Sequence, residues 1–205
     1  MLDVGRQQGL AEVRGRKLLQ LLRPFTTYRR ENSKFRGELT LTTGETPRKI
    51  IFLDIDGVLH SFDCSSTLFC SLQMLVLKEI VDKTGAGIVL TSNWRRTRAG
   101  MKEVSYHLKD FGMKVYSKTI DLRRNTAKAR AQEIYMWLKQ HPEVDSWLVL
   151  DDLNLLKYSN EQHLQILSNN FVRTNPLVGL TRDDLRPCLQ ILGASEASTS
   201  VVVAQ

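Results

Sequence analysis

Residues 49–59, KIIFLDIDGVL, constrain the fold more than any other part of the chain. Their first half is a run of apolar residues, which is typical of a strand buried on both faces in a parallel sheet. Asp54 and Asp56 follow at the C-terminal end, where open α/β sheets bind their ligands. Because side chains alternate along a strand, the two carboxylates share one face, and their repulsion calls for a metal ion or a shared proton.

Apolar runs alternate with helical patterns from residue 49 to residue 192. We expect strands at 49–54, 86–91, 113–116, 147–150 and 171–174, and helices at 72–83, 101–111, 127–140, 160–167 and 181–192. Pro187 is expected to kink the last helix, and residues 92–96 are expected to form a polar, basic loop. This alternation predicts an α/β fold, a Rossmann-like parallel sheet with helices on both faces.

The chain divides by composition into three parts. Residues 1–48 hold ten Lys and Arg against five Asp and Glu, and so carry most of the net charge of +7. We interpret them as a basic extension, partly helical or disordered, with a mitochondrial targeting helix as the alternative. Residues 49–193 form the predicted domain, and residues 194–205 form a flexible tail that is rich in Ser and Ala.

Cysteine content and hydropathy bear on the compartment. Three cysteines, Cys64, Cys70 and Cys188, are too few for a disulfide framework and favour a reducing compartment. No apolar run approaches the roughly 20 residues that a membrane helix needs, so we expect no membrane partner. The expected location is cytoplasmic, with mitochondrial or nuclear as alternatives. A basic chain favours anionic partners such as nucleic acid or phosphate.

Three of the predicted strands end in polar residues. These residues are Asp54 and Asp56 after the first strand, Thr91 and Ser92 after the second, and Asp151 and Asp152 after the strand at 147–150. Because parallel strands end at the same edge of a sheet, four carboxylates and two hydroxyls are expected to meet there. Such a set of oxygen ligands suits a hard divalent cation, and Mg²⁺ fits best.

The order and spacing of these residues resemble the haloacid dehalogenase-like (HAD) superfamily of phosphohydrolases. The resemblance is carried by FLDIDGVL at 52–59, IVLTS at 88–92, Lys128 or Arg130 at a helix start, and VLDD at 149–152. A closer likeness is to the HAD domain of the Swiss Army Knife RNA repair proteins. It is carried by IVLTSNWR at 88–95, by Arg130, Glu133, Ile134 and Trp137 on one helix, and by GLT at 179–181.

The resemblance implies a role for each carboxylate. Asp54 would be the nucleophile that forms an aspartyl-phosphate. Asp56 would protonate the leaving oxygen and later activate water. Mg²⁺ would be held by Asp54, the backbone carbonyl of Asp56 and Asp151, with Asp152 assisting.

The resemblance also implies the groups that contact phosphate. Ser92 would hydrogen-bond the phosphoryl group and is preferred over Thr91, because Asn93 follows it as loop. Arg130 would balance the phosphoryl charge and is preferred over Lys128. A guanidinium makes a forked contact where an ammonium is a point charge.

Several residues near these motifs have plainer interpretations. Ser92 could instead cap a helix, and the arginines that follow it could form a solvated face. Trp94, Trp137 and Trp147 are interpreted as packing residues, and the four histidines as structural, since they lack the spacing of metal ligands.

The distances between motifs bear on the substrate. Residues 57–91 and 93–129 leave no room for a large cap domain, so little or no cap is expected and the site is open. An open site suits a large phosphorylated substrate, such as an RNA or DNA end or a phosphoprotein. Asn93, Arg95 and Arg96 are the expected substrate contacts, and a polyanion could also follow Arg98, Arg123 and Arg124.

The sequence therefore predicts a magnesium-dependent phosphohydrolase. Two alternatives remain open at this point: a non-catalytic phosphate- or nucleic-acid-binding module with the same fold, and a small-molecule phosphatase of the nucleotide type.

Overall fold

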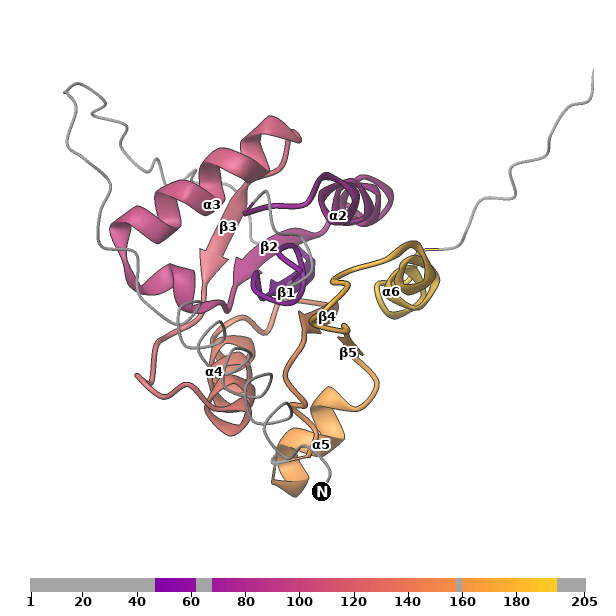
Figure 1. Ribbon diagram of the computed structural model, residues 1–205. Coiled ribbons are helices and arrows are strands. Elements are labelled where there is room, and N and C mark those ends of the chain that lie inside the picture. Colours follow the sequence, from indigo (N-terminus) through magenta and orange to yellow (C-terminus); the bar gives the residue numbers. More distant parts are fainter. Residues whose placement is uncertain (1–46, 62–67, 158–159, 195–205) are drawn as a thin grey trace, which may run out of the picture. The chain divides into compact units, whose positions relative to one another are not determined.

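The computed structural model describes residues 47–61, 68–157 and 160–194 (Figure 1). These residues all belong to one compact unit, Gly44–Gln205. The expectations for the basic extension before residue 47 and for the tail from residue 195 lie outside the described residues, as does Cys64.

Five parallel strands form the sheet: β1 (Lys49–Leu53), β2 (Gly87–Leu90), β3 (Val115–Lys118), β4 (Ser146–Asp151) and β5 (Phe171–Arg173). Their spatial order is β3-β2-β1-β4-β5, so the strand that comes first in the sequence is central. Leu53 of β1 pairs with Leu90 of β2 on one side and with Leu150 of β4 on the other. The three strands that end in the polar motifs are therefore neighbours.

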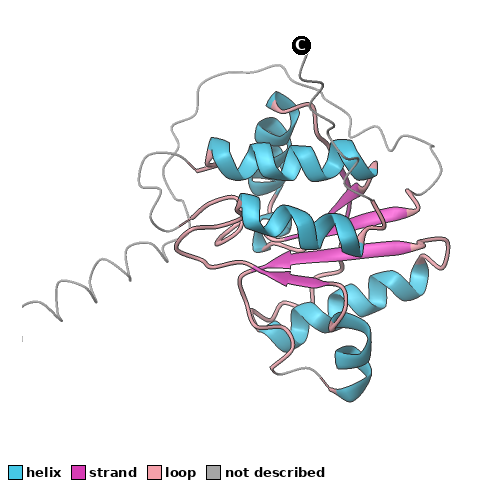
Figure 2. Ribbon diagram, turned by 90° about the vertical axis from the view of Figure 1, so that its right-hand side faces the viewer, coloured by secondary structure: helices cyan, strands magenta, loops and turns pink. Residues whose placement is uncertain are grey.

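Helices cover both faces of this sheet (Figures 1 and 2). They are α2 (Ser71–Thr84), α3 (Arg98–Asp110), α4 (Ala127–Gln140), α5 (Glu161–Leu167) and α6 (Leu185–Ile191). Ile51 and Leu53 pack in a core with residues of α2, α3 and α6, whereas Ile50 and Phe52 pack with residues of α4 and α5. Burial on both faces explains why β1 is a continuous apolar run. The predicted Rossmann-like α/β fold is confirmed.

Helix starts differ from the expectation at two places. Thr97 caps α3 by accepting a hydrogen bond from the Gly100 backbone N–H at 3.0 Å, so the helix begins at Arg98 and not at 101. A short 3₁₀ helix, η1 (Asn93–Arg96), precedes it where a loop was predicted. Thr97 therefore flanks both helices, since it follows the last residue of η1 and caps the first turn of α3.

The C-terminal helix also has a different first turn. It is a 3₁₀ turn, η2 (Arg182–Asp184), in which Thr181 and Asp184 form a capping box. Pro187 then lies in the first turn of α6, where a missing backbone N–H costs no helical hydrogen bond. At this position a proline fits a regular helix, so Pro187 gives no reason to expect a kink in α6. Among the described helices, none has the length and apolarity that crossing a bilayer requires.

Candidate active site

The hydrogen-bond ladder of the sheet continues past the ends of three strands and aligns their last residues. The backbone N–H of Asp54 donates to the Leu150 carbonyl at 3.0 Å, and that of Thr91 donates to the Leu53 carbonyl at 2.9 Å. Asp54 therefore lies between the end of β2 and the end of β4. The side chains that follow these strands meet at one edge of the sheet.

An aspartate cluster occupies this edge. Asp54, Asp151 and Asp152 each offer a carboxylate oxygen, and these oxygens all lie within 4.8 Å of one another. Asp54 and Asp151 are buried, and Asp152 is half-buried. Three converging carboxylates on neighbouring strand ends are the kind of donor set that holds a hard divalent cation.

Arg130 of α4 reaches into the aspartate cluster. Its Nη1 donates to Oδ2 of Asp54 and, at 2.8 Å, to Oδ2 of Asp151. Burial alone would lower the pKa of Arg130, but the charges of Asp54 and Asp151 outweigh it and raise that pKa. Lys128 is exposed, and its charge acts on His163 of α5. Of the two basic candidates, the fold brings Arg130 to the cluster and leaves Lys128 at the surface.

One guanidinium does not offset the charge of the whole cluster. Burial raises the pKa of Asp151 to about 7; Arg130 opposes this rise and Asp54 adds to it. Burial, reinforced by the charge of Asp54, likewise raises the pKa of Asp152 to about 6. Without another cation, these carboxyl groups therefore keep protons to a higher pH than ordinary aspartates do, Asp151 up to about pH 7 and Asp152 up to about pH 6. The oxygen donors and the unbalanced charge both fit a divalent metal ion.

Gly57 brings the loop after β1 against the aspartate cluster. Its φ of +75° is in the left-handed region, and a Cβ built there would lie 2.7 Å from the Cβ of Asp152. The Gly57 carbonyl also accepts a hydrogen bond from the Thr174 hydroxyl at 2.7 Å. Only glycine fits this combination of backbone conformation and close approach.

The carboxylate of Asp56 lies apart from the aspartate cluster and has its own partners. Its side chain is 46% exposed. Oδ2 accepts a hydrogen bond from Nε1 of Trp94 at 2.9 Å, and Oδ1 lies 3.3 Å from Nδ1 of His60. The sequence had given Trp94 a packing role and His60 a structural one. The contact of Trp94 has no local signal in the sequence, because it depends on the loops after β1 and β2 meeting in space, whereas His60 lies four residues after Asp56 in the same loop.

The two hydroxyls after β2 are both buried. Ser92 caps η1, and its Oγ accepts a long hydrogen bond of 3.5 Å from the Trp94 backbone N–H. The hydroxyl of Thr91 has no hydrogen-bond partner among the described residues. Both hydroxyls therefore remain candidates for a phosphate contact.

Arg95 requires a correction. Its side chain is 2% exposed, so it does not face solvent as the expected substrate contact would. It donates to the buried groups of several elements: the carbonyls of Thr91, Ser92, Thr119 and Ile120, and Oε2 of Glu133 at 2.6 Å. Arg95 is a brace that ties the loop after β2 to the end of β3 and to α4.

The other expected contacts are at the surface. Asn93 is exposed. Arg96 is also exposed at the residue level, but its guanidinium is engaged by Asp121 at 2.9 Å and by Asn125. Three further arginines are exposed: Arg98 at the start of α3, and Arg123 and Arg124 in the connection from β3 to α4.

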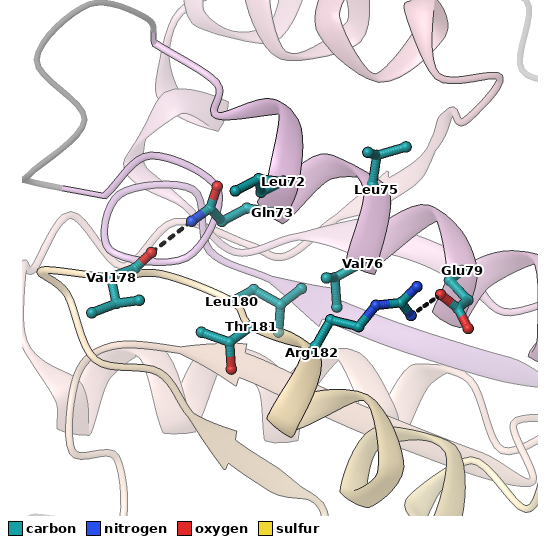
Figure 3. Close-up of a pocket in the computed structure, with 9 residues that line it drawn as sticks. All are labelled: Leu72, Gln73, Leu75, Val76, Glu79, Val178, Leu180, Thr181 and Arg182. Carbon is teal, nitrogen blue, oxygen red and sulfur yellow. Dashed lines mark hydrogen bonds and ion pairs between the residues drawn. The ribbon is translucent and has the colours of Figure 1, made fainter.

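A separate groove lies between α2 and residues 178–182 (Figure 3). It has a volume of about 380 Å³ and a mainly apolar lining that includes Leu72, Val76 and Leu180. An ion pair between Arg182 and Glu79 borders it. No residue of the aspartate cluster lines this groove, so it is not part of the candidate active site.

Comparison with known proteins identifies a family. A family model described as the HAD domain in Swiss Army Knife RNA repair proteins matches residues 50–185. The matched range is more than half of the chain and contains the aspartate cluster, Asp56 and Arg130. The search of curated proteins and the search of solved structures gave no match.

Proposed function

Since the chain belongs to the family of HAD domains in Swiss Army Knife RNA repair proteins, we propose that it is a magnesium-dependent phosphohydrolase that acts through an aspartyl-phosphate. Membership of the family points to phosphatase chemistry on a phosphorylated substrate. The observation that carries the proposal is the meeting of Asp54, Asp151 and Asp152 at one edge of the sheet, with Arg130 between two of them.

The aspartate cluster would hold the metal ion, and Mg²⁺ suits a site whose donors are all oxygens. The bound cation would neutralise charge, so that an anionic carboxylate can approach an anionic phosphate. The Asp56 backbone carbonyl is the further ligand that we propose.

Asp54 is well placed to be the nucleophile. Its Oδ1 accepts a hydrogen bond from the Ile55 backbone N–H at 2.8 Å, and Arg130 holds Oδ2, so the carboxylate has a fixed orientation. In the first step, an Asp54 oxygen bonds to phosphorus while the bond from phosphorus to the leaving oxygen breaks. Asp56 gives its proton to that leaving oxygen.

The second step uses the same two residues with reversed proton flow. Asp56, now a carboxylate, takes a proton from a water molecule whose oxygen attacks the phosphorus of the aspartyl-phosphate. The bond between phosphorus and Asp54 breaks, which releases inorganic phosphate and restores the carboxylate. Arg130 and a hydroxyl of Ser92 or Thr91 would stabilise the phosphoryl group in both steps.

We further propose a nucleic-acid end as the substrate. The described parts of the segments between the motifs contain α2 and β2, or α3 and β3, which belong to the core fold, so these segments leave no room for a large cap. The exposed residues Arg98, Arg123 and Arg124 could contact a polyanion. The family's link to RNA repair agrees with this choice.

A direct test compares a phosphorylated oligonucleotide with a mononucleotide and an aryl phosphate, with and without Mg²⁺. We expect hydrolysis that requires the metal, is lost in Asp54→Asn and is fastest for the oligonucleotide. Faster turnover of the mononucleotide would favour a small-molecule phosphatase. Salt-dependent binding of RNA without hydrolysis of any phosphoester would instead indicate a non-catalytic binding module.

A further inference from the structure

A hydrogen bond between side chains joins the loop after β1 to the loop after β2. The indole Nε1 of Trp94 donates to Oδ2 of Asp56 at 2.9 Å. The same loop after β2 carries Thr91 and Ser92, the candidate phosphate contacts. A single short segment therefore touches both the proposed acid/base and the proposed phosphate position.

Trp94 is itself held firmly. Its ring meets Phe69 edge-on at 5.9 Å, and Phe69 stacks on His107 of α3 at 4.3 Å. The first turn of α3 packs against the Trp94 backbone so closely that a Cβ at Gly100 would collide with the Trp94 carbonyl oxygen. The next residue, Arg95, is fixed by its buried hydrogen bonds. The indole is thus a rigid donor.

The carboxyl group of Asp56 lacks such support of its own. Nearly half of its side chain is exposed, and Oδ2 contacts Trp94 while Oδ1 contacts His60. An indole N–H can only donate, so it keeps Oδ2 as an acceptor and favours the carboxyl proton on Oδ1. The contact therefore selects both the plane of the carboxyl group and the oxygen that carries the proton.

We propose that Trp94 is a positioning residue that orients Asp56 for proton transfer to the leaving oxygen. The proposal rests on the function proposed above and adds a residue to it. Trp94 acts through Asp56 and not on the substrate, so its removal should slow both steps in which Asp56 moves a proton. The value of kcat/KM reports the first of them, the breaking of the bond from phosphorus to the leaving group, in which Asp56 loses a proton and the leaving oxygen gains it.

The test is a series of phenyl phosphates that runs from the 4-nitro to the 4-methyl compound. A 4-nitrophenolate leaves readily without a proton, whereas a 4-methylphenolate needs one. In Trp94→Phe, which keeps the ring against Phe69, we expect kcat/KM to fall about tenfold or more for the 4-methyl compound and less than about threefold for the 4-nitro compound. Trp147→Phe, the same change on the other face of the sheet, should leave the series unchanged.

Two further variants separate positioning from general damage. Asp56→Asn should show the same dependence on the leaving group, and adding Trp94→Phe to it should cause no further loss. An equal fall for all substrates in Trp94→Phe, or none, would overturn the positioning role while the proposed function stands. If the native chain hydrolyses no phosphoester, both proposals fall together.

The hydrogen bond can also be observed without an activity assay. The chain has three tryptophans, so each indole N–H signal in a ¹H–¹⁵N spectrum can be assigned by replacing one tryptophan at a time with Phe. Asp56→Ala should move the Trp94 signal and leave that of Trp147 in place. A Trp94 signal that does not move would overturn the proposal.

Discussion

Burial makes Asp151 and Asp152 weaker acids than ordinary aspartates. Both have a pKa above the ordinary value of 3.8: about 7 for Asp151 and about 6 for Asp152. The folded chain without metal therefore binds protons that the unfolded chain has already lost. The free energy of unfolding of the metal-free domain should fall as pH rises from about 4 to about 7.

Metal binding should show the opposite trend with pH, because a cation must displace these protons. We expect the affinity for Mg²⁺ to be on the order of 100-fold higher at about pH 7.5 than at about pH 5.5 if both acids ionise on binding. Calorimetric titration at the two pH values, in buffers of different ionisation enthalpy, measures the affinity and the protons released. Equal affinities would mean that both acids are already ionised before the metal binds.

Gly57 links backbone conformation to the aspartate cluster. Gly57→Ala adds a methyl group at φ +75°, where it would collide with Asp152. We expect a loss of about 1–3 kcal/mol in the free energy of unfolding and weaker Mg²⁺ binding, because Asp152 must move. Denaturant unfolding and metal titration give the two quantities.

Gly85 provides the matched control for Gly57. It has a similar φ of +68°, but a Cβ there would meet nothing within 4 Å. Gly85→Ala should therefore show backbone strain alone, with unchanged metal affinity. If both variants bind Mg²⁺ as the native chain does, Gly57 does not act on the aspartate cluster.

At the scale of elements, α4 is positioned by two charged side chains one turn apart. Arg130 contacts the aspartate cluster, and Glu133 receives Arg95 at 2.6 Å and the Leu122 backbone N–H at 2.8 Å. The pair of Arg95 and Glu133 is almost fully buried. Glu133 therefore sets the position of the helix that delivers Arg130.

Removing one partner of this buried pair should be costly. Glu133→Gln leaves the charge of Arg95 uncompensated, and we expect a loss of about 3–5 kcal/mol in the free energy of unfolding together with reduced phosphatase activity. Arg96→Gln, which breaks a more exposed ion pair on the same loop, should cost about 1 kcal/mol or less. Denaturant unfolding measures both, and equal losses would contradict the bracing role.

The elements themselves could largely be predicted from the sequence. Apolar runs located β1, β2 and β4 well, because these strands are largely buried. The more exposed edge strands β3 and β5 were also expected, but β3 begins at Val115 and not at 113. Apolar periodicity missed η1 and the first turn of α3, where a polar cap at Thr97 and not an apolar stripe starts the helix. Pro187 was expected to kink α6, since its place in the helix depends on a start that the pattern located only to within a few residues.

The carboxylates of the candidate site were predictable because their motifs follow strands, and Arg130 of α4 was expected from the family resemblance. Asp54, Asp151 and Asp152 meet because parallel strands end together, which the sequence order already implies. Arg95 was expected to be exposed like Arg96, because the sequence alone does not distinguish a buried arginine from an exposed one. Its partner Glu133 and the contact of Trp94 with Asp56 join segments 38 positions apart, so local spacing carried no sign of either.

At the scale of the whole molecule, surface charge bears on the size of the substrate. Arg123 and Arg124 are exposed in the connection that leads to α4. For Arg123→Glu with Arg124→Glu, we expect kcat/KM on a phosphorylated oligonucleotide to fall about tenfold or more at low salt, because backbone phosphates are repelled. The rate on an aryl phosphate should stay within about twofold.

The control for this variant is a charge reversal elsewhere. Lys139 is exposed in the last turn of α4, at the end of the helix away from Arg130. Lys139→Glu should leave both substrates unaffected. If the arginine variant loses activity equally on the small and the large substrate, or on neither, these arginines do not guide a polyanion.

The ladder that runs past the end of β1 has a consequence for motion. The backbone N–H groups of Asp54 and Thr91 are hydrogen-bonded within the central part of the sheet, so their amide hydrogens should exchange with solvent only when the whole domain opens. The proposed nucleophile then belongs to the part of the chain that fluctuates least. Adjustment to different substrates has to come from the surrounding loops, while the attacking carboxylate stays in place.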